Sequence, residues 1–210
     1  MYREQGVDAP GRLLAHFLPD EYVEKAAARG ARRSDAEPYF LYVGRMDAVK
    51  GVETLARHFA EGQSPAPLYL AGGGPLEATL RRRFDANPAI RFLGSHGQDE
   101  LGSLYRDALA LILPSAGYEV FGQVVLEGFA HATPAIVTEV GGARELVEAS
   151  GAGYVYGSDR ELAEALEGVA GDPELRDRLG GAGRDYVHRE HGEDDYVRRY
   201  ERLVRELGER

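Results

Sequence analysis

Residues 39–60, YFLYVGRMDAVKGVETLARHFA, contain a complete strand–turn–helix unit and decide the fold of this chain. The opening YFLYVG is almost entirely apolar, which is typical of a strand that is buried on both faces. VETLARHFA then repeats apolar residues at helical spacing. The glycines and polar residues between them mark a turn. The stretch therefore predicts a strand, a turn and a helix in succession.

The same unit recurs along the chain. Five more apolar runs, PLYLAG, IRFLG, LALILP, PAIVT and GAGYVY, each precede a segment of helical period. Six such units predict an α/β fold: a Rossmann-like six-stranded parallel sheet with helices on both faces. We assign residues 38–172 to this domain and residues 173–210 to two polar helices that pack on it. Residues 1–37 are interpreted as a short strand, a turn and a polar linker, the remnant of an interdomain connection.

Composition narrows the class of protein further. The chain has 210 residues, of which 43% are hydrophobic, enough for a substantial core. Its net charge of −10 argues against binding to nucleic acid or an anionic membrane. It has no cysteine, which excludes disulfides and thiolate metal sites. No signal peptide is recognisable, and the apolar runs are too short to span a bilayer, so a cytoplasmic protein is expected.

Ligands of open parallel sheets bind outside the carboxyl ends of the strands. Gly44, Arg45 and Lys50 follow the first predicted strand, and Lys50 is one of two lysines in the chain. The two cations could neutralise a phosphate or simply be solvated. Gly72, Gly73 and Gly74 follow the second strand; they fit either an ordinary tight turn or a close approach of a ligand. The dinucleotide fingerprint G-x-G-x-x-G is absent from the sequence.

Glu119 and Glu127 lie eight positions apart around an apolar segment. If a helix begins near Gly122, they bracket its N-terminus and do not face each other as an acid–base pair. The peptide N–H groups of Phe121, Gly122 and Gln123 would then point at a ligand between the two carboxylates. A solvated helix face is the alternative, but Glu127 lies between VVL and GFA, which have the character of core.

Four glycine-rich or acidic stretches, taken together, indicate one protein family more specifically than any one of them does alone. GRMDAVKG, AGGGP, PSAGYEVFGQVVLEGFAHATP and EVGGARELV occur in this order. They resemble the C-terminal, donor-binding half of retaining GT-B glycosyltransferases of group 1 (family 4), which carry G-R-x(4)-K-G, G-x-G-P, E-x(7)-E and G-G-x-x-E. The resemblance covers roughly residues 13–200. It implies one half of a GT-B fold and a nucleotide-sugar ligand: a UDP-, GDP- or ADP-hexose.

The resemblance also implies roles for individual residues. Arg45 and Lys50 match the basic pair that neutralises the donor diphosphate, and Glu119 matches the residue near the sugar hydroxyls; these three are the candidate catalytic residues. The candidate donor-binding residues are Gly44, Gly72, Gly73, Gly74, Ser95, His96, Val120, Phe121, Gly122, Gln123 and Glu127, with Glu127 holding the ribose. No metal and no cofactor is expected, and the metal-binding D-x-D pattern is absent from the sequence.

The chain departs from the family pattern in two positions and in length. Val120 and Ala132 stand where the family more often has glycine or, at position 120, proline. An N-terminal acceptor-binding domain is missing, so we expect little or no hexosyl transfer by this chain alone and membrane contact only through the absent half. The alternative is a stand-alone nucleotide-sugar-binding or regulatory module without catalysis. The motif pair disfavours a third possibility, an epimerase or phosphorylase.

Overall fold

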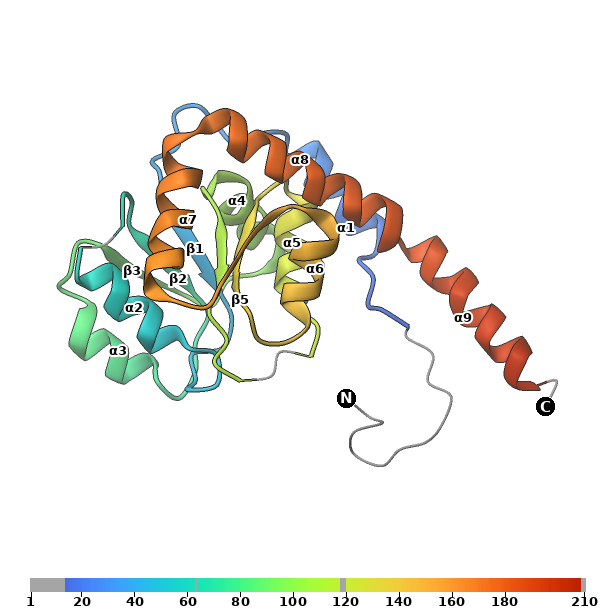
Figure 1. The fold of residues 1–210 in the computed structure, drawn as a ribbon, viewed down its shortest axis with the longest axis horizontal. Helices are drawn as coiled ribbons and strands as arrows, with labels where there is room; N and C mark the ends of the chain where they lie inside the picture. Colours follow the sequence, from blue (N-terminus) through green and yellow to red (C-terminus); the bar gives the residue numbers. More distant parts are fainter. Residues whose placement is uncertain (1–13, 63, 118–119, 209–210) are drawn as a thin grey trace.

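The computed structural model describes residues 14–62, 64–117 and 120–208. Six parallel strands form one sheet in the order β3-β2-β1-β4-β5-β6 (Figure 1). The strands are β1 (Phe40–Val43), β2 (Leu68–Ala71), β3 (Ile90–Gly94), β4 (Leu111–Leu113), β5 (Ala135–Thr138) and β6 (Gly153–Tyr156). The predicted Rossmann-like parallel sheet is confirmed.

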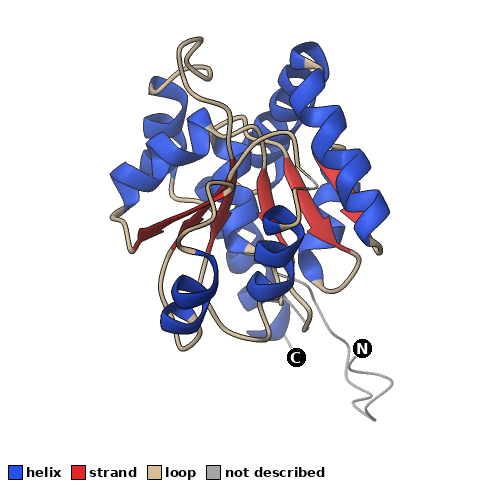
Figure 2. Ribbon diagram, turned by 90° about the vertical axis from the view of Figure 1, so that its left-hand side faces the viewer, coloured by secondary structure: helices blue, strands red, loops and turns tan. Residues whose placement is uncertain are grey.

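Helices cover both faces of this sheet (Figure 2). They are α1 (Asp20–Ala28), α2 (Val52–Ala60), α3 (Glu77–Phe84), α4 (Gln98–Asp107), α5 (Gln123–Ala130), α6 (Gly142–Ser150), α7 (Asp159–Gly171), α8 (Pro173–Glu190) and α9 (Glu193–Gly208). The alternation of strands and helices from β1 onward follows the order that the apolar runs predict.

Strand β1 shows how the sequence builds the two sides of the core. All four of its residues are buried. Phe40 and Tyr42 point into a cluster formed with α2, α3 and α7. Leu41 and Val43 point into the opposite cluster, formed with α1, α4, α5, α6 and α8. Because successive strand residues face opposite sides, a strand between two helical layers must be apolar throughout.

Helix α1 corrects the interpretation of the N-terminal segment. The sequence analysis places residues 20–28 in a turn and linker, but they form a helix whose Tyr22, Val23 and Ala26 are buried in the core. These three positions share one helix face, while Lys25 lies in the last turn, where it complements the helix dipole. Residues 1–13 lie outside the described residues, and the domain boundaries stay a prediction.

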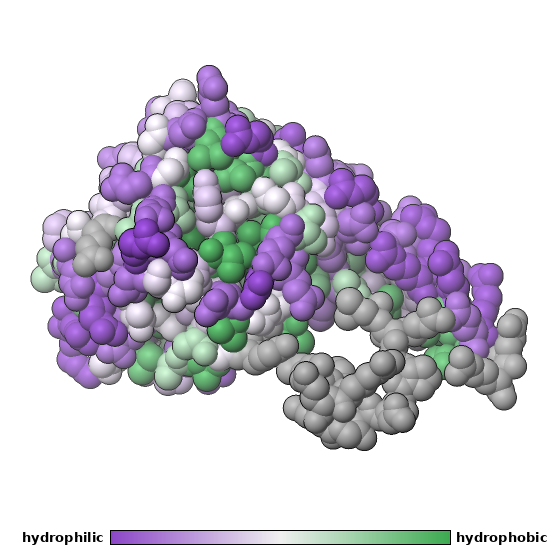
Figure 3. Space-filling view, in the orientation of Figure 1, coloured by the Kyte–Doolittle hydropathy of each residue, from purple (hydrophilic) through white to green (hydrophobic). Residues whose placement is uncertain are grey.

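The segment before α1 meets the turn between α8 and α9. Leu18 forms an isolated parallel bridge with Gly192, and its N–H donates to the carbonyl of His191 at 3.0 Å. Beyond this bridge α9 extends away from the body (Figure 1) and its visible surface is largely hydrophilic (Figure 3). Among the helices of the described residues, none is long and apolar enough to cross a membrane.

Candidate functional site

The strand order places a switch point between β1 and β4. From β1 the chain moves through β2 to β3 on one side of the sheet, then returns to β4 and continues to β6 on the other. In sheets of this kind the crevice outside the carboxyl ends at the switch point is the ligand site. The loops after β1, β2 and β4, which carry most of the predicted site residues, therefore form the candidate site.

Main-chain hydrogen bonds tie these three loops together. The N–H of Met46 donates to the carbonyl of Gly73 at 2.8 Å, and the N–H of Leu76 donates back to Met46 at 3.0 Å. On the other side, the N–H of Ala116 donates to the carbonyl of Val49 at 2.9 Å. The loop after β1 is thus held between the loops after β2 and β4, which brings their site residues to one edge.

The predicted glycines allow the backbones of the loops after β1 and β2 to pack closely against each other. Gly72 has φ of +124°, and a Cβ added to it would lie 2.1 Å from the carbonyl oxygen of Gly44. A Cβ on Gly74 would lie 2.6 Å from the carbonyl oxygen of Met46. Bare backbone is therefore required where the two loops meet, whether or not a ligand approaches.

Gly51, at the N-terminus of α2, provides a stability test of this interlocked edge. Its φ is +66°, and an added Cβ would lie 1.9 Å from the carbonyl oxygen of Pro114. Gly151 is a matched control, with φ of +65° and nothing within 4 Å of an added Cβ. We expect Gly51→Ala to lower the free energy of unfolding by about 2 kcal/mol more than Gly151→Ala, measured by urea denaturation. Equal losses would show that the approach to Pro114 imposes no constraint.

The two predicted cations lie in the loop after β1, with Asp47 between them. The Asp47 carboxylate accepts a hydrogen bond from the Lys50 N–H at 3.0 Å and lies 3.5 Å from Nε of Arg45. The Arg45 side chain is 69% exposed, so its guanidinium is open to a ligand at this edge. Sequence reasoning missed Asp47, although an aspartate three residues before the N–H that it caps is a recognised turn signal.

The segment before α5 places the predicted backbone groups at the helix N-terminus. Gly122 is the N-cap with φ of +92°, and Gln123 begins the helix, as the sequence predicts. The Phe121 ring packs against His16 and His191, with ring centroids 4.9 and 5.8 Å away, so this side chain belongs to the junction between the segment before α1 and the turn after α8. Val120 is 83% exposed. Glu119 lies outside the described residues, so its place opposite Glu127 stays a prediction.

Glu127 lies in the second turn of α5 and is partly buried. Its Oε2 accepts a hydrogen bond from the hydroxyl of Tyr105 at 2.9 Å, and Tyr105 on α4 is fully buried. Burial raises the pKa of Glu127, and the hydrogen bond from Tyr105 partly opposes this. A solvated helix face is therefore the wrong description of this residue. Nothing in the sequence signals Tyr105 as its partner.

The turn after β3 brings Ser95 beside the loop after β2. A Cβ added to Gly73 would lie 3.6 Å from Oγ of Ser95 and 3.1 Å from a carboxylate oxygen of Glu77, a residue that the sequence analysis did not single out. His96 points along α4, with its Nδ1 3.2 Å from Oε2 of Glu100. Within the described residues, no group of three or more histidine, aspartate and glutamate side chains is arranged to hold a metal ion.

The fold and this edge together define a doubly wound α/β protein whose switch point carries Arg45, Lys50 and glycine-rich loops beside the N-terminus of α5. Residues 24–186 match the family described as Glycosyl transferases group 1. The chain belongs to this family, and its sheet is that of GT-B glycosyltransferases. The match covers most of the chain and includes every predicted site residue.

Individual relatives agree with this assignment. The chain is 32% identical over 183 residues to alpha-D-kanosaminyltransferase of Streptomyces kanamyceticus, covering 79% of this chain and 46% of that protein. Sucrose-phosphate synthase from Thermosynechococcus elongatus superposes with a TM-score of 0.80 at 28% identity, covering 98% of this chain and 55% of that one. The Anabaena protein HepE, solved in complex with UDP, shares the fold with a TM-score of 0.70 at 19% identity, covering 91% of this chain and 53% of that one. The chain thus spans about half the length of these relatives.

Proposed function

We propose that this chain is the nucleotide-sugar-binding half of a hexosyltransferase that moves a sugar from a UDP-, GDP- or ADP-hexose to an acceptor with retention. The observation that carries the proposal is the interlocked edge at the switch point. There Arg45, Lys50 and the glycine backbone after β1 and β2 meet the loop that leads into α5. The UDP found in the HepE structure supports a nucleoside diphosphate as the ligand class.

The proposed chemistry relies on charge placed where the leaving group forms. Transfer breaks the bond between the anomeric carbon and a diphosphate oxygen. The acceptor hydroxyl oxygen bonds to that carbon instead, and its proton passes to the departing diphosphate. Arg45 and Lys50 stabilise the negative charge that grows on the departing diphosphate. The N-terminus of α5, which begins at Gln123, contributes N–H groups and a positive dipole. No metal ion takes part in this scheme.

In this proposal Glu127 and Glu119 bind different sugars of the donor. Glu127 holds the ribose hydroxyls, with its orientation fixed by Tyr105. Glu119 contacts the donor sugar. The acceptor is bound by a second domain that corresponds to the other half of the relatives, so the chain alone binds donor with little or no turnover.

A thermal-shift panel tests the ligand class. At 100 times its dissociation constant, a bound nucleoside diphosphate adds about 2.7 kcal/mol of stability, which raises Tm by roughly 5–10 °C for a chain of this length. We expect UDP, GDP or ADP to give this shift, with the free nucleosides giving less, and we expect EDTA to leave it unchanged. The absence of a shift with all three diphosphates would refute the donor site, and a shift that EDTA abolishes would refute its independence of metal.

A further inference from the structure

A cavity lies at the end of the strands opposite the candidate donor site. Its volume is about 200 Å³. The residues that line it come from the segment after α1, from the C-terminal ends of α4 and α5, and from helix α8. Its wall includes Ala108 and Pro134, which precede β4 and β5, so the cavity is at the amino edge of the sheet. The charged residues that line it are Arg32, Arg106, Arg176, Arg184 and Asp177.

Four arginines against one aspartate make this wall strongly positive, in a chain whose net charge is −10. Arg106 is fixed by Asp107, whose carboxylate accepts from Nε and Nη2 at 2.9 Å each. The same carboxylate also pairs with Arg33 at 2.9 Å, so one negative charge is shared by two guanidinium groups. The Asp107 carboxylate therefore leaves part of the local positive charge unbalanced.

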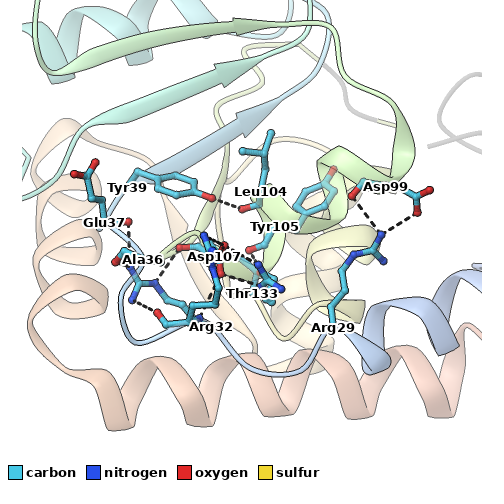
Figure 4. Close-up of polar contacts among 12 residues, drawn as sticks. Arg29, Arg32, Ala36, Glu37, Tyr39, Asp99, Leu104, Tyr105, Asp107 and Thr133 are labelled. Carbon is cyan, nitrogen blue, oxygen red and sulfur yellow. Dashed lines mark hydrogen bonds and ion pairs between the residues drawn. The ribbon is translucent and has the colours of Figure 1, made fainter.

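Arg32 is fixed by main-chain carbonyls and has no carboxylate partner among the residues that the structure describes. Its guanidinium donates to the carbonyls of Asp107, Ala36 and Glu37 at 2.9, 2.6 and 3.1 Å (Figure 4). These bonds order the segment between α1 and β1 and place the positive charge of Arg32 in the cavity wall. Carbonyl oxygens orient this charge but do not cancel it.

Arg176 and Arg184 on α8 complete the wall, and the carboxylates of Asp177 and Asp172 near Arg176 offset only part of this charge. Elsewhere on the described helices arginines pair with glutamates four residues away, as Arg144 and Arg160 do. Arg184 makes no ion pair or hydrogen bond with any residue that the structure describes, and Arg176 donates only to the carbonyl of Val169 at 3.1 Å. Burial and the nearby Arg32 lower the pKa of Arg176.

His131 forms part of the inner wall and reports on the charge of the cavity. It is 3% exposed, and neither ring nitrogen has a hydrogen-bond partner among the described residues. Burial, Arg29 and Arg106 lower the pKa of His131 to about 4. The imidazole is thus neutral at pH 7, because burial disfavours its charged form and the two guanidinium groups add to that effect.

We propose that this cavity binds the phosphoryl group of a small phosphorylated molecule. Guanidinium groups converging from three different segments match the several oxygens of a phosphate dianion. A volume of about 200 Å³ exceeds the space that several waters occupy, at ~30 Å³ each, and leaves room for a phosphoryl group and a small organic portion. The site lies at the other end of the strands from Arg45 and Lys50, so it is distinct from the proposed donor site.

NMR titration tests this site. Inorganic phosphate and a hexose monophosphate are titrated separately into the Lys50→Ala protein. This substitution weakens phosphate binding at the candidate donor site, so the remaining shifts report on the cavity. We expect amide shifts at Gly181 and a rise in the pKa of the His131 ring, because a bound anion offsets the guanidinium charges. Tighter binding of the hexose monophosphate would assign the site to a phosphosugar, and equal binding would assign it to phosphate itself. Without shifts at the cavity up to 10 mM of either probe, roughly the weakest binding that a charge-assisted site should show, the proposal fails.

Two variants on α8 make the test specific. Arg184→Gln should weaken phosphate binding about tenfold, because a charge-assisted contact is lost. Arg178→Gln, an exposed position on the same helix outside the cavity wall, should leave it within about twofold. Both side chains are exposed, so neither substitution removes a core contact. Equal weakening by the two substitutions would show that phosphate senses only the overall charge of α8, and would overturn the proposal.

Discussion

Replacing Lys50 with alanine should weaken the binding of a nucleoside diphosphate on the order of 100-fold and leave the free nucleoside within about twofold. Lys50 lies in the loop that Asp47 orders and that hydrogen bonds join to the loop after β4. An ammonium placed there makes a charge-assisted contact that only the diphosphate can use, and such contacts contribute about 1.5–3 kcal/mol. Isothermal titration of UDP and uridine at one ionic strength measures both affinities.

The other lysine of the chain supplies the control. Lys25 lies on α1, where it pairs with Glu21 four residues earlier and is 56% exposed. Lys25→Ala removes the same charge from the protein but not from the switch point, so both affinities should stay within about twofold of wild type. Comparable weakening of UDP and uridine by Lys50→Ala would instead place Lys50 near the nucleoside and remove its phosphate role.

The sheet could be predicted because burial on both faces leaves its own pattern in the sequence. YFLYVG and LALILP are apolar at consecutive positions, as a strand between two helical layers requires, and they are too short for a buried helix. The strand order could not be predicted in this way, because neighbouring strands such as β1 and β4 are about 70 residues apart in sequence. The same holds for the bridge of Leu18 to Gly192, which joins residues that are more than 170 positions apart in the sequence.

Helix α1 was missed for a local reason. DEYVEKAAA has good helix formers, acidic residues in its first turn and a lysine in its last, but it is only nine residues long. A helix of that length is marginal by itself, so its stability comes from Tyr22 and Val23 packing on α5 and its neighbours. These tertiary contacts cannot be predicted from the sequence of the segment alone.

The position of a candidate site residue could be predicted where that residue directly follows a predicted strand. Arg45, Lys50 and the glycines follow strands, and the carboxyl ends of parallel strands share one edge, so their meeting follows from the fold. The contacts that orient the site join separate units and leave no such pattern. The bond from Tyr105 to Glu127 connects α4 to α5 through side chains alone, and no spacing in the sequence indicates it.

Replacing Glu127 with glutamine should weaken UDP binding on the order of 50-fold. An amide oxygen can still accept from Tyr105, but the charged acceptor for the ribose hydroxyls is lost. The same substitution should change the affinity for 2′,3′-dideoxy-UDP by no more than about twofold, because that ligand lacks the hydroxyls. Calorimetry with both ligands measures the difference; an equal loss for the two would remove Glu127 from the ribose site.

Glu127→Gln should at the same time raise Tm at pH 7.5, with a gain that shrinks toward pH 4. Burial raises the pKa of Glu127 in the folded protein above its unfolded value, so the folded state holds the proton more tightly. Stability from this group is present below the unfolded pKa and is lost as pH rises through the folded pKa, and the neutral amide avoids that loss. Glu167→Gln, at an exposed position on α7, is the control for the loss of one negative charge. A carboxylate that weakens the fold at neutral pH yet strengthens UDP binding is retained for its ligand, and that combination separates a binding residue from a structural one.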